Sequence, residues 1–236
     1  MIQIAACSDI HSPKYFKEFE ISLKQIKKKI DLFLFAGDLI LKGKYDEISK
    51  IINLLDKYEI TNIYSVFGNE EYNSIYDKIL ELAADKIIFL KDQTKILKIK
   101  TKTIGIVGTK GSLDRPTFWQ AKYVPDISKT YTERIKKIEG LLKNLKADFK
   151  IFVTHYAPTY LTLSGEKKTA FPSIGSKRFE SVLKKFPPDV VIHGHSHIGR
   201  KFAYLGTIPI YNVAFPIRKT ITFIKLPTKG SLLSYF

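Results

Sequence analysis

The sequence predicts an α/β protein that begins with a parallel sheet and continues into antiparallel strands. Residues 2–7, 32–36 and 63–67 are short apolar runs rich in β-branched or aromatic side chains, typical of strands that are covered on both faces. Between them, in residues 16–30 and 48–58, apolar side chains recur every three or four positions, which predicts two helices. This alternation of strands and helices indicates parallel strands joined by right-handed crossovers.

The second half of the chain has a different pattern. Residues 97–107 first alternate apolar side chains and threonine with lysine and then become apolar, which predicts antiparallel strands in a second sheet. A helix is predicted over residues 128–146, with Ser128 as its cap, and a buried strand over residues 150–154. Residues 157–176 are rich in Gly, Pro, Ser and Thr, so they predict a long loop.

The last part of the chain predicts one more helix and three more strands. The helix lies near residues 179–186, before two prolines that would end it. The strand at residues 190–192 runs directly into a histidine-rich segment. Residues 209–214 and 220–226 read as further antiparallel strands.

Length and composition favour one globular domain over residues 1–236, since 44% of the residues are hydrophobic. The first apolar run is short and contains Gln3, so it does not resemble a signal peptide. No other run approaches the length of a membrane span. We therefore expect a cytoplasmic protein without a membrane partner. Cys7 is the only cysteine, which excludes an internal disulfide and a thiolate zinc site.

The chain is strongly basic, with 39 Lys and Arg against 23 Asp and Glu and a formal charge of +16. Such a charge would attract nucleotides, polyphosphates or nucleic acid. Many lysines, however, lie in the helical stretches 24–29 and 136–146, where they would form the solvated face. No stripe of alternating arginine and aromatic residues is present, so the solvated face is favoured over a nucleic-acid patch.

All five histidines lie in three places that each directly follow a predicted strand: His11, His155 and the segment containing His193, His195 and His197. Asp9 and His11 are two residues apart, as are His195 and His197, so each pair would project to one side of extended backbone. The loops after strands are also where open α/β sheets bind their ligands. These positions predict a metal site.

Two oxygen donors follow the same rule. Asp38 comes after the strand at residues 32–36 and Gly37, and Asn69 comes after the strand at residues 63–67 and Gly68. Seven nitrogen or oxygen donors result: Asp9, His11, Asp38, Asn69, His155, His195 and His197. This set is too large for one tetrahedral zinc ion, and it predicts two divalent ions with five or six ligands each.

With these residues, the chain resembles the calcineurin-like metallophosphoesterase superfamily. Its pattern of D-x-H, G-D, G-N, a lone H and G-H-x-H is met by Asp9-Ile10-His11, Gly37-Asp38, Gly68-Asn69, His155 and Gly194-His195-Ser196-His197. The resemblance implies a four-layer α/β/β/α sandwich with two mixed sheets. It also implies a ligand set: Asp9, His11 and His197 for one metal, Asn69, His155 and His195 for the other, and Asp38 bridging both.

A shorter resemblance lies at the end of the predicted loop. Gly175-Ser176, before a basic helix start, is similar to a segment of the cyclic-nucleotide phosphodiesterase-like prokaryotic branch of the superfamily. Because the loop at residues 157–176 follows His155 directly, we expect it to overhang the metals. It is the candidate for substrate selection.

The expected activity is hydrolysis of a phosphomonoester or a small phosphodiester by two metal ions and a bridging hydroxide. Two cations about 3.5–4 Å apart neutralise the phosphoryl oxygens and lower the pKa of a bound water toward about 7. Manganese is the first expectation for the metal, with iron or zinc as alternatives. The expected partner is a small phosphorylated molecule, nucleotides included; nucleic acid is less favoured.

One position departs from the superfamily pattern. The residue after Asn69 is commonly a histidine that stabilises the leaving group, and here it is Glu70. An ionised carboxylate repels an anionic substrate, and it donates a proton only if its pKa is raised. Asn69 and Glu70 are the candidate catalytic residues, with the role of Glu70 open.

Two alternatives remain beside the phosphoesterase. A nuclease of the same superfamily would use the basic charge, and a scaffold without activity would explain Glu70. The complete set of seven donors argues against the scaffold.

Other conspicuous residues have simpler explanations. His193 matches no ligand position, so we expect a buried residue or one that supports a ligand, and Cys7 should fill space in the core. Phe118 and Trp119 would form either a wall of the substrate site or a loop anchor. Three arginines suit phosphate binding but are expected on the surface: Arg115, Arg178 and Arg200.

Overall fold

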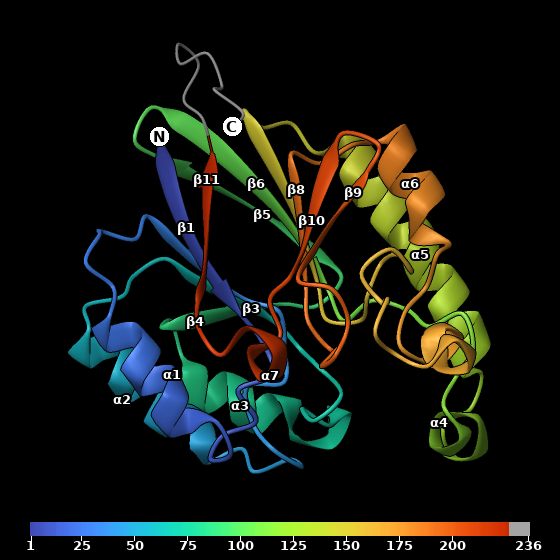
Figure 1. Ribbon diagram of the computed structural model, residues 1–236, viewed down its shortest axis with the longest axis horizontal. Coiled ribbons are helices and arrows are strands. Elements are labelled where there is room, and N and C mark those ends of the chain that lie inside the picture. Colours follow the sequence, from blue (N-terminus) through green and yellow to red (C-terminus); the bar gives the residue numbers. More distant parts are fainter. Residues whose placement is uncertain (227–236) are drawn as a thin grey trace.

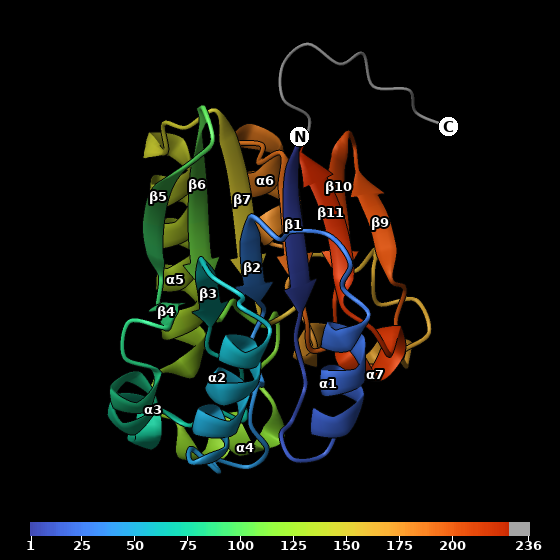
Figure 2. The same cartoon turned by 90° about the vertical axis from the view of Figure 1, so that its left-hand side faces the viewer.

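Two β-sheets face each other, and helices cover the outer face of each (Figures 1 and 2). The structure is a computed structural model that describes residues 1–226. The strand order is β11-β1-β2-β3-β4 in the first sheet and β5-β6-β7-β8-β10-β9 in the second. The predicted four-layer sandwich with two mixed sheets is confirmed. The single domain over residues 1–236 stays a prediction, because residues 227–236 lie outside the described part.

The first sheet contains the parallel strands that the sequence predicts. Its strands are β1 (Ile2–Cys7), β2 (Leu32–Phe35), β3 (Ile63–Val66), β4 (Ile87–Leu90) and β11 (Thr222–Leu226). Strands β1 to β4 run parallel, whereas β11 pairs antiparallel with β1. The outer face is covered by α1 (Phe16–Lys24), α2 (Glu47–Lys57) and α3 (Tyr76–Ala83).

The second sheet is more parallel than the sequence indicates. Its strands are β5 (Gln93–Ile99), β6 (Lys102–Thr109), β7 (Phe149–Thr154), β8 (Val190–His193), β9 (Phe202–Leu205) and β10 (Ile208–Asn212). The predicted antiparallel pair is found as β5 and β6. The segment predicted at residues 209–214 is antiparallel to β9 but parallel to β8, because β9 turns back at the edge and lets β10 enter beside β8. Helices α5 (Ile127–Asn144) and α6 (Phe179–Lys185) cover the outer face.

Three apolar layers hold the sandwich together. The layer between the sheets includes Ile4, Leu34, Val66, Ile106, Val153 and Ile192. The layer under the first helices includes Phe19, Phe33, Phe35, Ile51 and Ile79, and the layer under the other helices includes Ile138, Leu142, Phe152, Phe179 and Leu183. Neighbouring residues of one strand therefore enter different layers, and this explains why the central strands are apolar at nearly every position.

Several boundaries differ from those predicted. Helix α1 ends at Lys24, and Ile30 reaches the core from the loop that follows. Helix α5 begins after Asp126, whose φ of 52° is left-handed, and it is not capped by Ser128. The elements that the sequence did not predict are short: α3, β4, β9, α4 (Phe118–Tyr123), α7 (Phe215–Arg218) and the 3-10 helices η1 (Asn73–Ile75) and η2 (Lys168–Ser173). No helix within residues 1–226 has both the length and the apolar composition needed to cross a bilayer.

Gly108 on β6 lies in close contact with the first sheet, next to Leu90 of β4 and Val66 of β3. A Cβ placed there would overlap the Cβ of Leu90 and lie 2.8 Å from its Cδ1 and 3.0 Å from Cγ1 of Val66. Gly140 on α5 is the opposite case, because a Cβ there would meet no atom within 4 Å.

We expect Gly108→Ala to lower the free energy of unfolding by about 1–3 kcal/mol, because the added methyl group forces β4 and β6 apart. Gly140→Ala is the matched control and should raise it by about 0.5–1 kcal/mol through helix propensity. Urea unfolding followed by circular dichroism measures both. Equal effects of the two substitutions would contradict the sheet-to-sheet contact at Gly108.

Candidate metal centre

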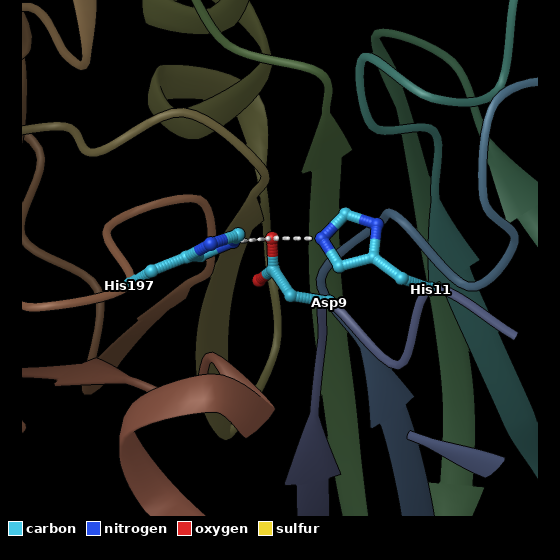
Figure 3. A group of neighbouring side chains, drawn as sticks. All are labelled: Asp9, His11 and His197. Carbon is cyan, nitrogen blue, oxygen red and sulfur yellow. Dashed lines mark hydrogen bonds and ion pairs between the residues drawn. The ribbon is translucent and has the colours of Figure 1, made fainter. Parts of the chain in front are cut away.

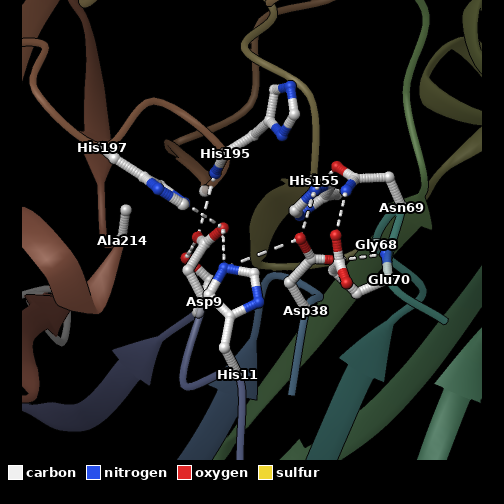
Figure 4. A network of polar contacts seen from close by, with 12 residues as sticks. Asp9, His11, Asp38, Gly68, Asn69, Glu70, His155, His195, His197 and Ala214 are labelled. Carbon is white, nitrogen blue, oxygen red and sulfur yellow. Dashed lines mark hydrogen bonds and ion pairs between the residues drawn. The ribbon is translucent and has the colours of Figure 1, made fainter. Parts of the chain in front are cut away.

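The predicted donors all lie just beyond the carboxyl ends of strands. They come from the segments after β1 (Asp9 and His11), β2 (Asp38), β3 (Asn69), β7 (His155) and β8 (His195 and His197). Because the parallel strands of both sheets end at the same edge of the sandwich, side chains from five separate segments meet there (Figure 4). The structure brings all seven together.

One group of donors consists of Asp9, His11 and His197, whose ligand atoms lie within 4.8 Å of one another (Figure 3). The Oδ1 atom of Asp9 is 3.0 Å from Nε2 of His197 and 3.7 Å from Nε2 of His11. Its other oxygen, Oδ2, accepts hydrogen bonds from the hydroxyl of Ser8 and the backbone N–H of His195. These contacts fix the carboxylate so that Oδ1 faces both imidazoles.

The second group consists of Asp38, His155 and His195, again with ligand atoms within 4.8 Å. Nε2 of His155 is 3.5 Å from Oδ2 of Asp38 and 2.9 Å from Oδ1 of Asn69. The same Oδ2 atom of Asp38 lies 3.9 Å from Nε2 of His11, so this carboxylate lies between the two groups. That is the position a bridging ligand would need.

The carboxylates of the site repel one another. Burial raises the pKa of Asp38 well above its usual value, and the negative charges of Glu71 and Asp9 raise it further. Burial also acts to raise the pKa of Asp9, but the hydrogen bond to His197 and the neighbouring imidazoles hold it below its usual value. A divalent cation between these groups would offset the repulsion, which is one reason that the donors fit metal ions.

The buried histidines are in the form that binds metals. Burial lowers the pKa of His155 to about 4 and that of His195 well below its usual value, so both are neutral at pH 7. Nδ1 of His155 lies 2.9 Å from the backbone oxygen of Ala36. Since a carbonyl can only accept, Nδ1 donates there and the lone pair of Nε2 points into the site.

Four of the seven donors have a left-handed backbone. The φ angles are 57° for Asp9, 45° for His11, 53° for Asp38 and 68° for His195. Positive φ is uncommon for residues other than glycine and is concentrated at functional sites. The chain therefore turns sharply after three different strands and directs the donor side chains toward one point.

Glu71 is an important residue that the sequence analysis did not identify. Its buried carboxylate accepts hydrogen bonds from four backbone N–H groups, those of Gly68 (2.6 Å), Asp38 (2.9 Å), Leu39 (2.6 Å) and Ile40 (3.3 Å). It thus ties the turn after β2 to the turn after β3. In the sequence, Glu71 is an acid two residues beyond Asn69, and nothing in the sequence distinguishes its role from that of its neighbour Glu70.

Glu70 itself is half-buried, and its carboxylate accepts the backbone N–H of Lys42 at 2.6 Å. Its own backbone N–H donates to Oδ1 of Asp38 at 2.7 Å. Glu70 therefore contacts Asp38 through its main chain, and its Oε1 lies 3.4 Å from the amide nitrogen of Asn69.

Glu71→Gln should lower the free energy of unfolding by about 1–3 kcal/mol, because the amide leaves some of the four buried N–H groups without an acceptor. It should also weaken metal binding, since both turns carry donors. The matched control is Glu70→Gln, which removes one acceptor from a half-buried position and should change stability by less than about 1 kcal/mol. Thermal unfolding with and without added manganese measures both effects; identical behaviour of the two variants would show that Glu71 does not support the turns.

The remaining conspicuous residues lie outside the two donor groups. His193 is buried, with Nδ1 at 2.8 Å from the oxygen of Gly194, and Cys7 is a buried core residue. Phe118 is 85% exposed on α4, whereas Trp119 lines a cavity. None of the three arginines reaches the donors: Arg178 pairs with Asp114, Arg115 donates to the oxygen of Thr169, and Arg200 is exposed.

A cavity of about 1010 Å³ opens beside the donors. Asn69, Glu70 and His195 line its metal side. The other lining residues lie within the ranges 67–76, 90–92 and 110–134, together with Tyr156. No residue of the loop at 157–176 lines the cavity. That loop instead contacts the histidine segment, because the Glu166 carboxylate accepts the Ser196 hydroxyl at 2.9 Å.

A family model described as calcineurin-like phosphoesterase matches residues 2–199. The chain belongs to this family. The matched range contains all seven donors and both sheets up to β8. Membership in the cyclic-nucleotide phosphodiesterase-like branch stays a prediction, as does the assignment of each donor to a metal. No curated protein sequence matches the chain significantly.

Solved structures share the fold at low sequence identity. A phosphopantetheinyl hydrolase from Mycobacterium tuberculosis has a TM-score of 0.73 and 14% identity, with 98% of each chain covered. A hypothetical protein from Thermus thermophilus has a TM-score of 0.57 and 13% identity, covering 89% of this chain and 75% of that one. The NAD nucleotidase of Haemophilus influenzae has a TM-score of 0.55 and 16% identity, covering 91% of this chain and 45% of its own. At these identities the likeness concerns the fold.

Metal-free protein titrated with Mn²⁺ should take up about two equivalents and unfold at a higher temperature when loaded, because binding to the folded state alone stabilises it. Asp38→Asn should reduce both the stoichiometry and the shift, since this carboxylate lies between the donor groups. Calorimetry and elemental analysis give the count. A single equivalent in the unaltered chain would mean that the two groups do not act as two sites.

Proposed function

We propose that the protein is a dinuclear-metal-dependent hydrolase of phosphate esters, acting on a phosphomonoester or a small phosphodiester. The observation that carries this proposal is the pair of donor groups with the Asp38 carboxylate between them, next to a cavity that His195 and Asn69 line. Manganese is the proposed metal, with iron and zinc as alternatives: the carboxylate and amide oxygens suit manganese, and the imidazoles suit iron and zinc.

Two divalent ions, when bound, polarise the phosphoryl oxygens and lower the pKa of a water molecule. The chain's own residues hold and orient the components. His155 is fixed through Ala36 and faces both Asp38 and Asn69, so it sets the geometry of the second group. Neutral imidazoles add no charge of their own, so the net charge of the site is set by the carboxylates and the metals.

Asn69 and Glu70 are the proposed residues at the leaving group. Both line the cavity, and the Asn69 amide lies between His155 Nε2 at 2.9 Å and the Glu70 carboxylate at 3.4 Å. Oε2 of Glu70 accepts the backbone N–H of Lys42, and this hydrogen bond holds the carboxylate in place. A proton for the leaving group would have to be carried by the other oxygen, Oε1, which lies 3.4 Å from Nδ2 of Asn69.

A small phosphorylated substrate, nucleotides included, fits the proposal. The names of two proteins with this fold, the phosphopantetheinyl hydrolase and the NAD nucleotidase, support such a substrate. A cytoplasmic location is part of the proposal and is supported by the single cysteine. The charge of +16 supports a nuclease as the second candidate.

Manganese-loaded protein should hydrolyse an aryl phosphate or a bis-aryl phosphate. Asp38→Asn and His155→Ala should each reduce the rate by more than about 100-fold, because each removes a proposed ligand and changes to residues that only support ligands already cost 10–100-fold. Steady-state kinetics measures this, with circular dichroism to confirm folding. Lys137→Gln on the exposed side of α5 is the control and should retain full activity.

Three results separate the alternatives. Cleavage of DNA that weakens steeply with salt, without turnover of small esters, would favour the nuclease. Two bound metals without activity on any ester or nucleic acid would favour a scaffold. Equal activity of the unaltered chain and Asp38→Asn would contradict the proposed site.

A further inference from the structure

The cavity beside the donors combines cationic and aromatic walls. Three cationic side chains line it, Lys91, Lys110 and Arg134, and they come from the turn after β4, the end of β6 and helix α5. Six aromatic side chains line it as well: Phe67, Tyr72, Tyr76, Trp119, Tyr131 and Tyr156. A volume of about 1010 Å³ is far larger than a phosphoryl group needs. The cavity can therefore hold the part of a substrate that lies beyond the scissile bond.

Two of the three cations already have partners. Nε of Arg134 lies 3.0 Å from the Asp92 carboxylate, and its Nη1 donates to the oxygen of Gly111 at 2.8 Å. The ammonium of Lys91 lies 5.0 Å from the centre of the Tyr76 ring. Asp92 offsets the charge of Arg134, so these two side chains mainly shape the wall.

Lys110 differs from both. Within residues 1–226, its ammonium has no carboxylate within 4.0 Å and no hydrogen bond. Burial lowers its pKa to about 8, while the negative charges of Asp38 and Glu71 act to keep it protonated, so most of it is charged at pH 7. The Glu71 carboxylate is occupied by four backbone N–H groups and Asp38 faces the imidazoles, so neither pairs with Lys110 directly.

The aromatic side of the cavity has exposed rings over a buried floor. Tyr72 is 45% exposed, whereas Tyr131 and Tyr156 are each 2% exposed, and Gln120 of α4 donates to the hydroxyl of Tyr156 at 3.2 Å. Trp119, from the preceding position of α4, is 61% exposed and can contact a ligand without first leaving a packed core. Such walls favour planar rings, which stack on aromatic side chains.

We propose that this cavity binds the leaving group of the substrate, and that Lys110 determines specificity by binding a second anionic group on a leaving group that also carries an aromatic ring. The inference rests on the proposed function, which places the scissile phosphoryl group at the metals. Hydrolysis adds OH to phosphorus and H to the departing oxygen, so the leaving group departs with its ring and its second anion intact. A nucleoside phosphate is a leaving group of this kind, because it carries both an aromatic ring and an anionic phosphate.

The binding test uses metal-free protein, so that it does not depend on hydrolysis. Trp119 is the only tryptophan of the chain and lines the cavity, so its fluorescence reports occupancy. Adenosine 5′-monophosphate carries the ring and the anion, adenosine the ring alone, and inorganic phosphate the anion alone. We expect the monophosphate to bind at least about tenfold more tightly than either of the others.

Variants at Lys110 separate charge from shape. Lys110→Gln should weaken binding of the monophosphate about tenfold and leave adenosine unchanged, whereas Lys110→Arg should retain most of the affinity. Lys137→Gln removes an exposed lysine outside the cavity and should change neither. Equal binding of adenosine and its monophosphate, or an unaltered affinity in Lys110→Gln, overturns the role of Lys110. Equal binding of phosphate and the monophosphate overturns the role of the aromatic wall.

A kinetic arm connects the cavity to the reaction. With manganese bound, Lys110→Gln should lower kcat/KM for adenosine 3′,5′-bisphosphate, whose leaving group keeps a phosphate, about tenfold more than kcat/KM for p-nitrophenyl phosphate. If nucleotides bind as expected but no ester is hydrolysed, the proposed function is wrong, whereas the assignment of the cavity as a nucleotide-binding site stands. Equal losses on both substrates overturn the assignment of Lys110 to the leaving group.

Discussion

The chemistry of this protein depends on the convergence of parallel strands from two sheets at one edge of the sandwich. Strands β1, β2 and β3 of the first sheet and β7 and β8 of the second all end there, each is followed by a donor, and the chain turns sharply after three of them. Buried carboxylates gathered in this way repel one another, and the Glu71 carboxylate adds to the repulsion while it joins two of the turns. Bound cations and hydrogen bonds from backbone N–H groups would offset this repulsion.

The elements that could be predicted from the sequence are those in which the local pattern of apolar residues matches the buried surface. The strands at residues 2–7, 32–35 and 63–66 were predictable because both faces are covered, so nearly every position is apolar. The donors were predictable because glycine turns follow two of those strands and the paired histidines follow another predicted strand, at residues 190–192. Strand β4 is as short as β2 and β3, but no glycine turn with a donor follows it, and α3 and β9 span only eight and four residues.

Other features could not be predicted because they depend on packing between distant segments. Whether β10 lies parallel to β8 is decided by the path of β9, not by the composition of residues 208–212. Glu70 and Glu71 are adjacent acids, and only the close approach of two turns decides which one is buried. Lys110 follows a strand without any motif, and it lies beside a cavity whose lining residues come from distant segments, among them residues 67–76 and helices α4 and α5. The proposed metal ligands can thus be recognised from motifs in the sequence, whereas the residues that line the cavity cannot.

The pairing of β11 with β1 has a consequence for biosynthesis. Residues 2–7 leave the ribosome long before residues 222–226, yet these later residues form the strand that covers one edge of β1. Until those residues have been made, β1 presents an open edge to other chains in the crowded cell, and open edges invite intermolecular pairing. A chain truncated before β11 would contain all seven donors but leave this edge of the first sheet unprotected, which makes such fragments natural clients for chaperones and proteases.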